Sequence, residues 1–408
     1  MNDAGLQPAA ISSIAGTTPK GGGLAALQLQ PTLASADDRI ALDMAQAVRT
    51  AGGVAILASA GGALLPELKR VGSTHHQLPL DGRNPFTIRS NAAKLVRLVQ
   101  EEEVGLIHAR GVSAVWPAYL AARRTGIGLV VGVDSLAPRG HALANFYNGV
   151  VARADRIVAV SDYLADRLRR RYGLDDRRLR VVGRGIDLMR FDPARVTPER
   201  VIQLAQQWRL PDGLPVVMMP VRFARGSGVA TLLAALAAIG SREFHVLLVS
   251  IGDGEEGFEG ELEAEIARHG LGGRVQIEKE CRDMPAAYRL ADVVVHAASE
   301  PAAFLPAIAE AQAMGRPVVA LAHGAAVEQF ARSPMGWLAE PGDPAALAAA
   351  IGKALSLTLE DRERLSGEAV MRAHARYDKG RMCAATLAVY RELLEVQRWR
   401  ATPALTVA

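Results

Sequence analysis

Short apolar runs alternate along this chain with longer segments of helical periodicity, and this alternation restricts the fold more than any other feature. The first half contains VAILAS, VGLIHA, GLVVGV and RIVAVS, and the second contains PVVMMP, HVLLVSIG, VQIE, VVVHAA and PVVALA. Short buried strands that are joined by helices form parallel sheets built from βαβ units. The sequence therefore predicts an α/β protein with two parallel sheets.

The strand pattern stops and restarts across residues 184–215, which are rich in proline and charge. A domain boundary near residues 193–212 is the simplest explanation, because a single continuous sheet would require this polar stretch to be an insertion. We predict a flexible tail, two Rossmann-like domains and a final helix that crosses back to the first domain, at residues 1–23, 24–198, 199–378 and 379–408.

Composition argues against several classes of protein. The two cysteines, Cys281 and Cys383, are too few for a disulfide framework, and no spacing of cysteine with histidine resembles a zinc site. The N-terminal tail lacks a basic region followed by an apolar core, and no apolar run is long enough to span a bilayer. We therefore expect a cytoplasmic protein without a structural metal.

Arginines gather between residues 167 and 184, although the net charge of the whole chain is only +4. A basic face of this kind attracts anionic membranes or phosphorylated substrates, and it would place the protein peripherally at the inner face of the membrane. The alternative is an ordinary solvated helix face and loop. Aromatic residues are sparse here, so we do not expect nucleic-acid binding.

A glycine pattern typical of dinucleotide sites occurs once, at Gly252, Gly254 and Gly257 after an apolar run. Three acidic residues, Asp253, Glu255 and Glu256, would lie where a pyrophosphate should bind, and they would repel it. A glycine-rich turn into a helix explains the pattern better, because acidic residues suit the first turn of a helix. We predict no NAD or FAD cofactor.

The order of several sequence blocks closely resembles the retaining glycosyltransferases of family four. The blocks are LIHAR, RADRIVAVSDYLADRLRRRYG and VVGRGIDLMRFDP in the first half, then CRDMPAAYRLADVVVHAASEPAAFLPAIAEAQAMGRPVVALAHGAAVEQF and GWLAEPGDPAALAAAI. The resemblance spans residues 24–396 and implies the GT-B fold, in which two Rossmann-like domains face each other across a cleft. It also implies transfer of a hexose from a UDP- or GDP-linked sugar, without a metal.

The resemblance further implies which residues meet the donor. Glu310 matches a glutamate that binds both ribose hydroxyls, which suits a carboxylate with several acceptor positions. Arg222 matches an arginine that neutralises the diphosphate, and Arg225 could assist it or be an ordinary exposed loop arginine. The other matching positions on the donor side are Ser227, Arg282, Phe304, Leu305 and Glu328. Asp283, beside Arg282, is equally suited to cap the following helix.

Several donor positions depart from the family pattern. Ala302 stands where the family has a glutamate beside the donor sugar, and Ser227 replaces a lysine that binds the diphosphate. Leu305 replaces a glycine and is followed by Pro306, so the loop has lost a small residue and a backbone donor. Glu328 is retained, although alanines replace the two glycines that usually precede it.

The first half departs from the pattern as well. Asp37 and Asp38 occupy a loop in which the family has two glycines, so acids there would face the leaving phosphates. Asp134 replaces a histidine that often follows the strand GLVVGV. His108 and Arg110 lie at a strand end, where open α/β sheets bind ligands, and we include these two residues and Asp134 as candidate cleft residues. A histidine at such a point is often simply a satisfied hydrogen-bonding residue.

Two functions therefore remain open. The first is a retaining glycosyltransferase that acts on a glycan or lipid-linked acceptor in the synthesis of cell-surface polysaccharide or lipopolysaccharide. The second is a catalytically impaired relative that binds a nucleotide sugar or a partner protein. The losses at Ala302 and Ser227 count against activity, because these enzymes stabilise a departing nucleotide diphosphate electrostatically. The family resemblance outweighs them, so we predict the active retaining glycosyltransferase first. No catalytic residue is assigned.

Overall fold

The computed structural model of this protein describes residues 24–35, 38–138, 140–239, 243–252, 254–331 and 333–401. The predicted tail at 1–23, Asp37, Asp253 and the end of the predicted segment 379–408 lie outside the described residues.

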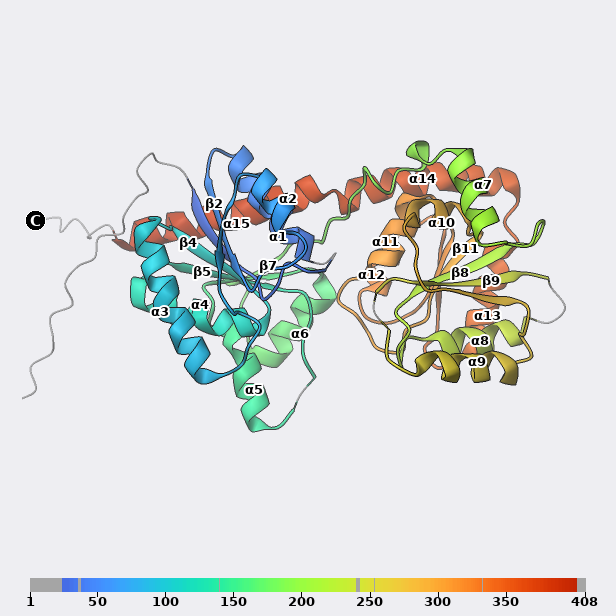
Figure 1. The fold of residues 1–408 in the computed structure, drawn as a ribbon, viewed down its shortest axis with the longest axis horizontal. Coiled ribbons are helices and arrows are strands. Elements are labelled where there is room, and N and C mark those ends of the chain that lie inside the picture. Colours follow the sequence, from blue (N-terminus) through green and yellow to red (C-terminus); the bar gives the residue numbers. More distant parts are fainter. Residues whose placement is uncertain are drawn as a thin grey trace, which may run out of the picture.

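The N-terminal domain contains a sheet of parallel strands in the order β3-β2-β1-β4-β5-β6-β7 (Figure 1). Its strands are β1 (Ala25–Leu29), β2 (Val54–Ser59), β3 (Thr74–Gln77), β4 (Leu106–Arg110), β5 (Gly128–Val133), β6 (Arg156–Ala159) and β7 (Leu179–Val181). Its helices are α1 (Arg39–Thr50), α2 (Leu65–Arg70), α3 (Pro85–Glu101), α4 (Val112–Thr125), α5 (Ala142–Asn148) and α6 (Asp162–Tyr172). Apolar side chains cover both faces of the sheet, which is what a fully parallel sheet requires.

The C-terminal domain repeats this plan with the strand order β10-β9-β8-β11-β12-β13, again parallel. Its strands are β8 (Val216–Val221), β9 (His245–Ser250), β10 (Val275–Glu278), β11 (Val293–His296), β12 (Val318–Leu321) and β13 (Gly336–Ala339). Its helices include α8 (Val229–Ala237), α9 (Phe258–Arg268), α10 (Met284–Leu290), α11 (Pro306–Ala313), α12 (Ala326–Phe330) and α13 (Pro344–Leu355). The prediction of an α/β fold with two Rossmann-like domains is confirmed.

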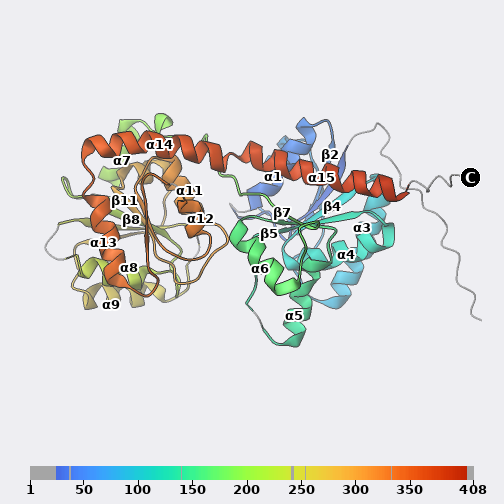
Figure 2. The same ribbon diagram turned by 180° about the vertical axis from the view of Figure 1, so that it is seen from behind.

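Two long helices at the end of the chain connect the domains. Helix α14 (Leu359–Tyr377) packs against α11 in the C-terminal domain, and α15 (Lys379–Ala401) lies along the N-terminal domain, where it packs against α1 (Figure 2). Tyr390 and Leu393 of α15 are buried in a core that also contains residues of β1, β2 and α1. The final helix is thus part of the first domain in space.

The chain first crosses between the domains upstream of residue 198, where the sequence placed the end of the first domain. Ile186 forms an isolated bridge with Asp378, and Phe191 packs edge-on against Tyr288 with ring centroids 5.9 Å apart. Both residues belong to the core of the C-terminal domain, together with Trp208 beyond α7 (Pro198–Gln207). Because these apolar side chains are buried in the C-terminal core, they determine where the chain enters the second domain. The prolines and charges around them made this point difficult to predict from the sequence.

Each sheet has a point at which the strand order reverses. It lies between β1 and β4 in the first sheet and between β8 and β11 in the second. Open α/β sheets bind ligands beyond the carboxyl ends of the strands at such a point. The topology therefore predicts that ligands bind at the loops that follow these four strands.

Candidate functional site

Glu310 lies in α11, the helix that follows the reversal point of the C-terminal sheet. Proline at the first position of α11 suits a helix start because it has no N–H to satisfy there. The Glu310 carboxylate accepts a hydrogen bond from the hydroxyl of Tyr288, 2.8 Å away on α10. Burial, and then the neighbouring Glu310, raise the pKa of Tyr288 well above its usual value, so its hydroxyl keeps its proton and donates. Tyr288 therefore orients the Glu310 carboxylate.

The loop after β8 carries the cations that the sequence predicted for the diphosphate. Arg222 is exposed at the carboxyl end of β8, beside the turn at Gly252. Arg225 is also exposed and pairs with Glu255, at 3.8 Å, and with Glu261 of α9. Its charge is thus balanced by two acids, and a phosphate would have to displace them.

The glycine-rich turn is the start of α9, as predicted. Gly257 is the residue before the helix, with φ +80°, and acidic residues occupy the first turn. A Cβ atom at Gly254 would lie 3.0 Å from the carbonyl oxygen of Phe223, so this turn packs closely on the loop after β8. Its acids hold Arg225.

The loop after β11 packs between the domains. Phe304 contacts the cores of both domains, lies edge-on to Tyr377 at 6.1 Å and has the Arg184 guanidinium 5.7 Å from its ring. The backbone N–H of Leu305 donates to Gln329 Oε1 at 3.0 Å, and its carbonyl accepts from Gln329 Nε2 at 3.1 Å. These two residues, which were predicted to meet the donor, take part in packing because the loop is apolar and its backbone amide is already bonded.

Glu328 joins the two domains. Its carboxylate accepts the backbone N–H of Tyr163, 3.0 Å away in the first turn of α6, beside the N-cap Ser161. Burial raises the pKa of Glu328, partly opposed by this hydrogen bond. The positive end of a helix favours a carboxylate, so Glu328 acts here as a cap supplied by the other domain.

The neighbouring residues Arg282 and Asp283 make different contacts. Arg282 is exposed and bonds to Glu280 at 2.8 Å. Asp283 caps α10 by accepting the N–H of Ala286 at 3.2 Å, and it also pairs with Arg200 at 2.7 Å. The capping alternative for Asp283 is confirmed.

The three candidate residues of the N-terminal domain form a row across β4 and β5. His108 is buried, and its Nδ1 lies 2.5 Å from the hydroxyl of Tyr390 on α15. Burial lowers the pKa of His108 to about 3, so the ring is neutral near neutral pH. Arg110 pairs with Asp134 at 2.6 Å where the two strands end. Only this ion pair reaches the strand ends, because His108 lies beneath α15.

Asp38 satisfies its own loop. Its carboxylate accepts hydrogen bonds from the backbone N–H groups of Ala34 and Ser35, both at 2.9 Å, and from Gln30 Nε2 at 2.5 Å. The expectation that this acid faces the leaving phosphates is wrong for Asp38, because its oxygens are turned into the loop between β1 and α1. The carboxylate takes the place that an anion would take among these amides.

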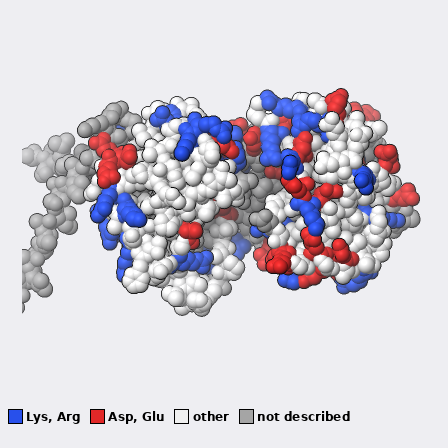
Figure 3. Space-filling view, viewed as in Figure 1, with Lys and Arg blue, Asp and Glu red and all other residues white. Residues whose placement is uncertain are grey.

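The arginines of residues 167–184 are largely engaged within the protein. Arg169 pairs with Asp166 and Asp176, Arg178 bonds to the carbonyl oxygen of Ala154, and Arg180 bonds to Glu392 of α15. On the face drawn in Figure 3, basic and acidic side chains are interspersed, and acids gather over α9. Few of the predicted basic charges are therefore left to form a common surface.

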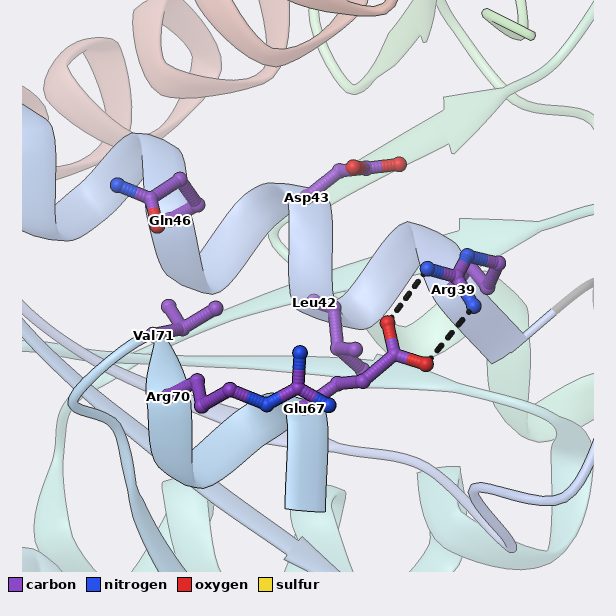
Figure 4. Close-up of a pocket in the computed structure, with 7 residues that line it drawn as sticks. All are labelled: Arg39, Leu42, Asp43, Gln46, Glu67, Arg70 and Val71. Carbon is purple, nitrogen blue, oxygen red and sulfur yellow. Dashed lines mark hydrogen bonds and ion pairs between the residues drawn. The ribbon is translucent and has the colours of Figure 1, made fainter. Parts of the chain in front are cut away.

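A pocket of about 300 Å³ lies apart from these loops, between α1 and α2 (Figure 4). Arg39 crosses it to bond both oxygens of Glu67, with the longer contact at 3.2 Å. The pocket is lined by Arg39, Leu42, Asp43, Gln46, Glu67, Arg70 and Val71. Its two arginines are matched by two carboxylates, so the lining has no excess charge to select a ligand.

Two kinds of feature are absent from the part of the chain that the structure describes. No helix there is both long and apolar enough to cross a membrane. No cluster of three or more His, Cys, Asp or Glu side chains there is arranged to hold a metal ion.

Sequence reasoning missed Tyr288 and the cross-domain role of Glu328. A lone tyrosine in MPAAYRLA carries no signal of its own, because only the packing of α10 beside α11 brings it to Glu310. The contact of Glu328 with α6 joins residues 165 positions apart. Neither contact can be predicted from the spacing of residues along the chain.

Comparison with known proteins agrees with this architecture. Residues 38–190 match the model of Glycosyltransferase Family 4, and residues 214–356 match that of Glycosyl transferases group 1. A glycosyltransferase from Rickettsia africae has 26% identity and a TM-score of 0.83 over 91% of this chain and 99% of its own. The structure of Anabaena Alr3699/HepE in complex with UDP has 23% identity and a TM-score of 0.77, and the match covers 90% of this chain and 100% of that one.

Curated relatives are D-inositol 3-phosphate glycosyltransferases. The protein from Actinosynnema mirum is 31% identical over 71% of this chain and 69% of its own length. The protein from Salinispora tropica is 33% identical over 60% of this chain, and the match spans only 52% of that relative's length. The two models and the Actinosynnema relative cover both halves of the chain, and the chain therefore belongs to the glycosyltransferases, with a Family 4 first half and a group 1 second half.

Proposed function

We propose that this protein transfers a hexose from a nucleotide sugar to an acceptor hydroxyl with retention of anomeric configuration. The observation that carries the proposal is the position of Glu310, which follows the reversal point of the C-terminal sheet and is oriented by Tyr288. The Anabaena protein of the same fold was solved with UDP, with UDP and glucose, and with UDP-glucose, and we extend this class of donor to the present chain. UDP and GDP remain alternatives for the nucleotide.

In the proposed complex the C-terminal domain binds the donor. Glu310 accepts hydrogen bonds from the two ribose hydroxyls, since a carboxylate can accept several hydrogen bonds at once. Arg222 faces the diphosphate, and Arg225 joins it after exchanging Glu255 and Glu261 for phosphate oxygens. These cations stabilise the nucleotide diphosphate as it departs, and an oxygen of that diphosphate accepts the proton of the acceptor hydroxyl.

The acceptor is proposed to lie on the N-terminal side. Arg110 and Asp134 end adjacent strands there, and an ion pair with an exposed carboxylate can bond a polyhydroxylated molecule. The curated relatives are named for D-inositol 3-phosphate, which supports a phosphorylated polyol, whereas a glycan or lipid-linked acceptor of a surface polysaccharide or lipopolysaccharide is the other candidate. A panel of both classes, assayed with the donor that the protein binds, separates them.

We place the protein in the cytoplasm, with peripheral contact to an anionic membrane as a further proposal. That contact would rely on exposed arginines such as Arg170 and Arg177, because Arg169, Arg178 and Arg180 are bonded internally. Binding to anionic vesicles that is lost in the double variant Arg170→Gln, Arg177→Gln would support it.

The donor site can be tested by substituting each partner of the hydrogen bond between Tyr288 and Glu310. Glu310→Ala removes the carboxylate, whereas Tyr288→Phe removes its partner and keeps the carboxylate. We expect Glu310→Ala to weaken UDP or GDP binding by about 1–3 kcal/mol, and Tyr288→Phe to weaken it less. Calorimetry with UDP, GDP and ADP measures both.

Three outcomes have distinct meanings. Undiminished nucleotide binding in Glu310→Ala would rule out the ribose role. Wild-type protein that binds no nucleotide would contradict the proposed function. Nucleotide binding without hydrolysis or transfer from any donor in a panel would instead support the catalytically impaired alternative, which the losses at Ala302 and Ser227 motivate.

A further inference from the structure

Three polar residues lie at the carboxyl ends of neighbouring strands in the C-terminal sheet. Ser227 lies in the loop after β8, His296 is the last residue of β11, and His323 follows β12. Strands β8, β11 and β12 are adjacent in the sheet, and the first two flank its reversal point. Ser227 and His296 therefore lie at the ends of the two strands to which topology assigns a ligand, and His323 follows the neighbouring strand.

All three residues flank one short segment, Ala297–Ser299. The backbone N–H of Ser299 donates to the carbonyl oxygen of Gly226 at 3.3 Å, which fixes the loop of Ser227 beside this segment. His323 Nε2 lies 3.0 Å from the carbonyl oxygen of Ala298. Gly228 approaches the same segment so closely that a Cβ atom there would be 2.0 Å from the carbonyl oxygen of Ala297. The arrangement is tightly packed.

Each of the three side chains nevertheless has a buried polar atom without a partner. Among the described residues, no group bonds to Ser227 Oγ, His296 Nδ1 or His323 Nδ1, and each of these atoms is shielded from solvent. A buried polar atom that lacks a hydrogen bond costs about 1–3 kcal/mol, and native proteins rarely leave several together. By contrast, His245 in the same sheet bonds to Gln276 at 3.1 Å.

The chemistry of the three groups suits hydroxyls better than phosphates. Burial first, and then His323, lower the pKa of His296 to about 4, so its ring is neutral near pH 7. A neutral imidazole and a serine hydroxyl can each donate or accept a hydrogen bond, as can a sugar hydroxyl. A diphosphate requires cations, and neither Ser227 nor the neutral ring of His296 supplies one. The loop after β11 has alanine at position 302, so it supplies no acid there.

We propose that Ser227, His296 and His323 form a subsite that binds the hydroxyl groups of the donor hexose. This subsite rests on the proposed function, because it receives the sugar only if the nucleotide occupies the Glu310 side of the same loops. Its hydrogen bonds replace the contacts that an acid at position 302 would make.

The experiment compares a nucleotide with its hexose conjugates. Dissociation constants are measured by calorimetry for the diphosphate that the wild type binds, UDP or GDP, and for its glucose, galactose and mannose conjugates. We expect Ser227→Ala and His296→Leu to weaken the preferred conjugate about 5- to 10-fold and to leave the free diphosphate within about 2-fold. His296→Gln, which keeps a donor and an acceptor, should recover part of the loss.

His245→Leu is the matched control, because it removes a buried histidine of the same sheet whose side chain is already bonded. It should change neither dissociation constant. Ser227→Ala deletes a single hydroxyl, so it keeps the test decisive if His296→Leu fails to fold. Equal affinities for conjugate and free diphosphate in the wild type, or variants that weaken both ligands equally or neither, would overturn the subsite and assign the three atoms to ordered water. Wild-type protein that binds no nucleotide would overturn the proposed function and the subsite together.

Discussion

The two sheets end at equivalent reversal points but leave their polar side chains in different states. In the N-terminal domain the charged groups are matched, since Asp38 is bonded by its own loop and Arg110 is paired with Asp134, although Gln30 Oε1 and His108 Nε2 are also buried without a partner among the described residues. In the C-terminal domain Ser227 and His296 keep buried polar atoms without a partner among the described residues. The first arrangement stabilises its loops, whereas the second costs stability unless a ligand or water completes it.

This contrast predicts which residues affect the stability of the fold and which affect ligand affinity. Groups that satisfy one another contribute to folding, so their loss should lower stability and change nucleotide binding little. Groups that remain unsatisfied contribute little to folding, so their loss should change affinity instead, as expected where stability is given up for function. Substitutions in the two domains should therefore change different quantities.

The largest effect is expected where the loops of the C-terminal site interlock. Gly228→Ala would force a Cβ atom to within 2.0 Å of the Ala297 carbonyl oxygen, at a φ of +90°. Overpacking and left-handed strain together should cost about 2–4 kcal/mol of unfolding free energy, measured by urea denaturation. Gly213→Ala is the control, because it has a φ of +77° with no atom within 4 Å and should cost about 1 kcal/mol. Equal losses in the two variants would show that the loops are not interlocked.

The ion pair of the N-terminal site should affect stability rather than donor affinity. Asp134→Ala leaves Arg110 unpaired, and the Arg110 side chain is only 10% exposed. We expect a loss of about 2 kcal/mol, less than for a fully buried pair because Asp134 is 39% exposed. The double variant Arg110→Met, Asp134→Ala should recover much of the loss in thermal denaturation. A variant that weakens UDP binding strongly while it melts like the wild type would break the comparison.

Acid should destabilise the protein through His108. Its folded pKa of about 3 lies below the usual 6.5, so the unfolded state binds more protons between these values. Stability is therefore complete above the unfolded pKa and falls as pH drops below about 6.5, by up to about 1.4 kcal/mol per pH unit for this group. His108→Gln should reduce the slope between pH 5 and 6.5 in denaturation curves, and the remaining slope comes from groups such as His296, whose pKa burial also lowers. Tyr390→Phe, which keeps the histidine, should lower stability and retain the slope; an unchanged slope in His108→Gln would refute the assignment.

The smallest effect is expected at the contact between the domains. Glu328→Ala removes a cap from α6 and should cost about 1 kcal/mol, whereas Glu328→Gln keeps an acceptor and should cost about half as much. Differential scanning calorimetry can measure both. A larger loss in Glu328→Gln than in Glu328→Ala would show that the hydrogen bond to Tyr163 is not what Glu328 contributes.

Much of the fold could be predicted because most strands are apolar and β-branched. VAILAS is β2 and GLVVGV is β5, with the predicted bounds. No comparable signal marks β1, AALQL, or β3, THHQ, because neither has β-branched apolar residues in a run. These strands exist through their parallel pairing with β2, which is a tertiary effect.

The site was predictable only in part. Asp283 was identified as a cap because capping is local in sequence. Asp38 was misjudged because the amides that hold its carboxylate are arranged by the path of the loop, which residue type does not reveal. Phe304 and Glu328 belong to contacts between domains, and no periodicity within one domain encodes them.

The position of α15 has a consequence for how the protein is made. Helix α15 follows the second domain in the chain but supplies Tyr390 and Leu393 to the core of the first domain, and Gly128 of β5 is small enough to let Leu393 approach. During synthesis, part of one face of the first sheet therefore stays uncovered while residues 186–378 emerge. A chain cut short at residue 378 would lack part of the core of its first domain.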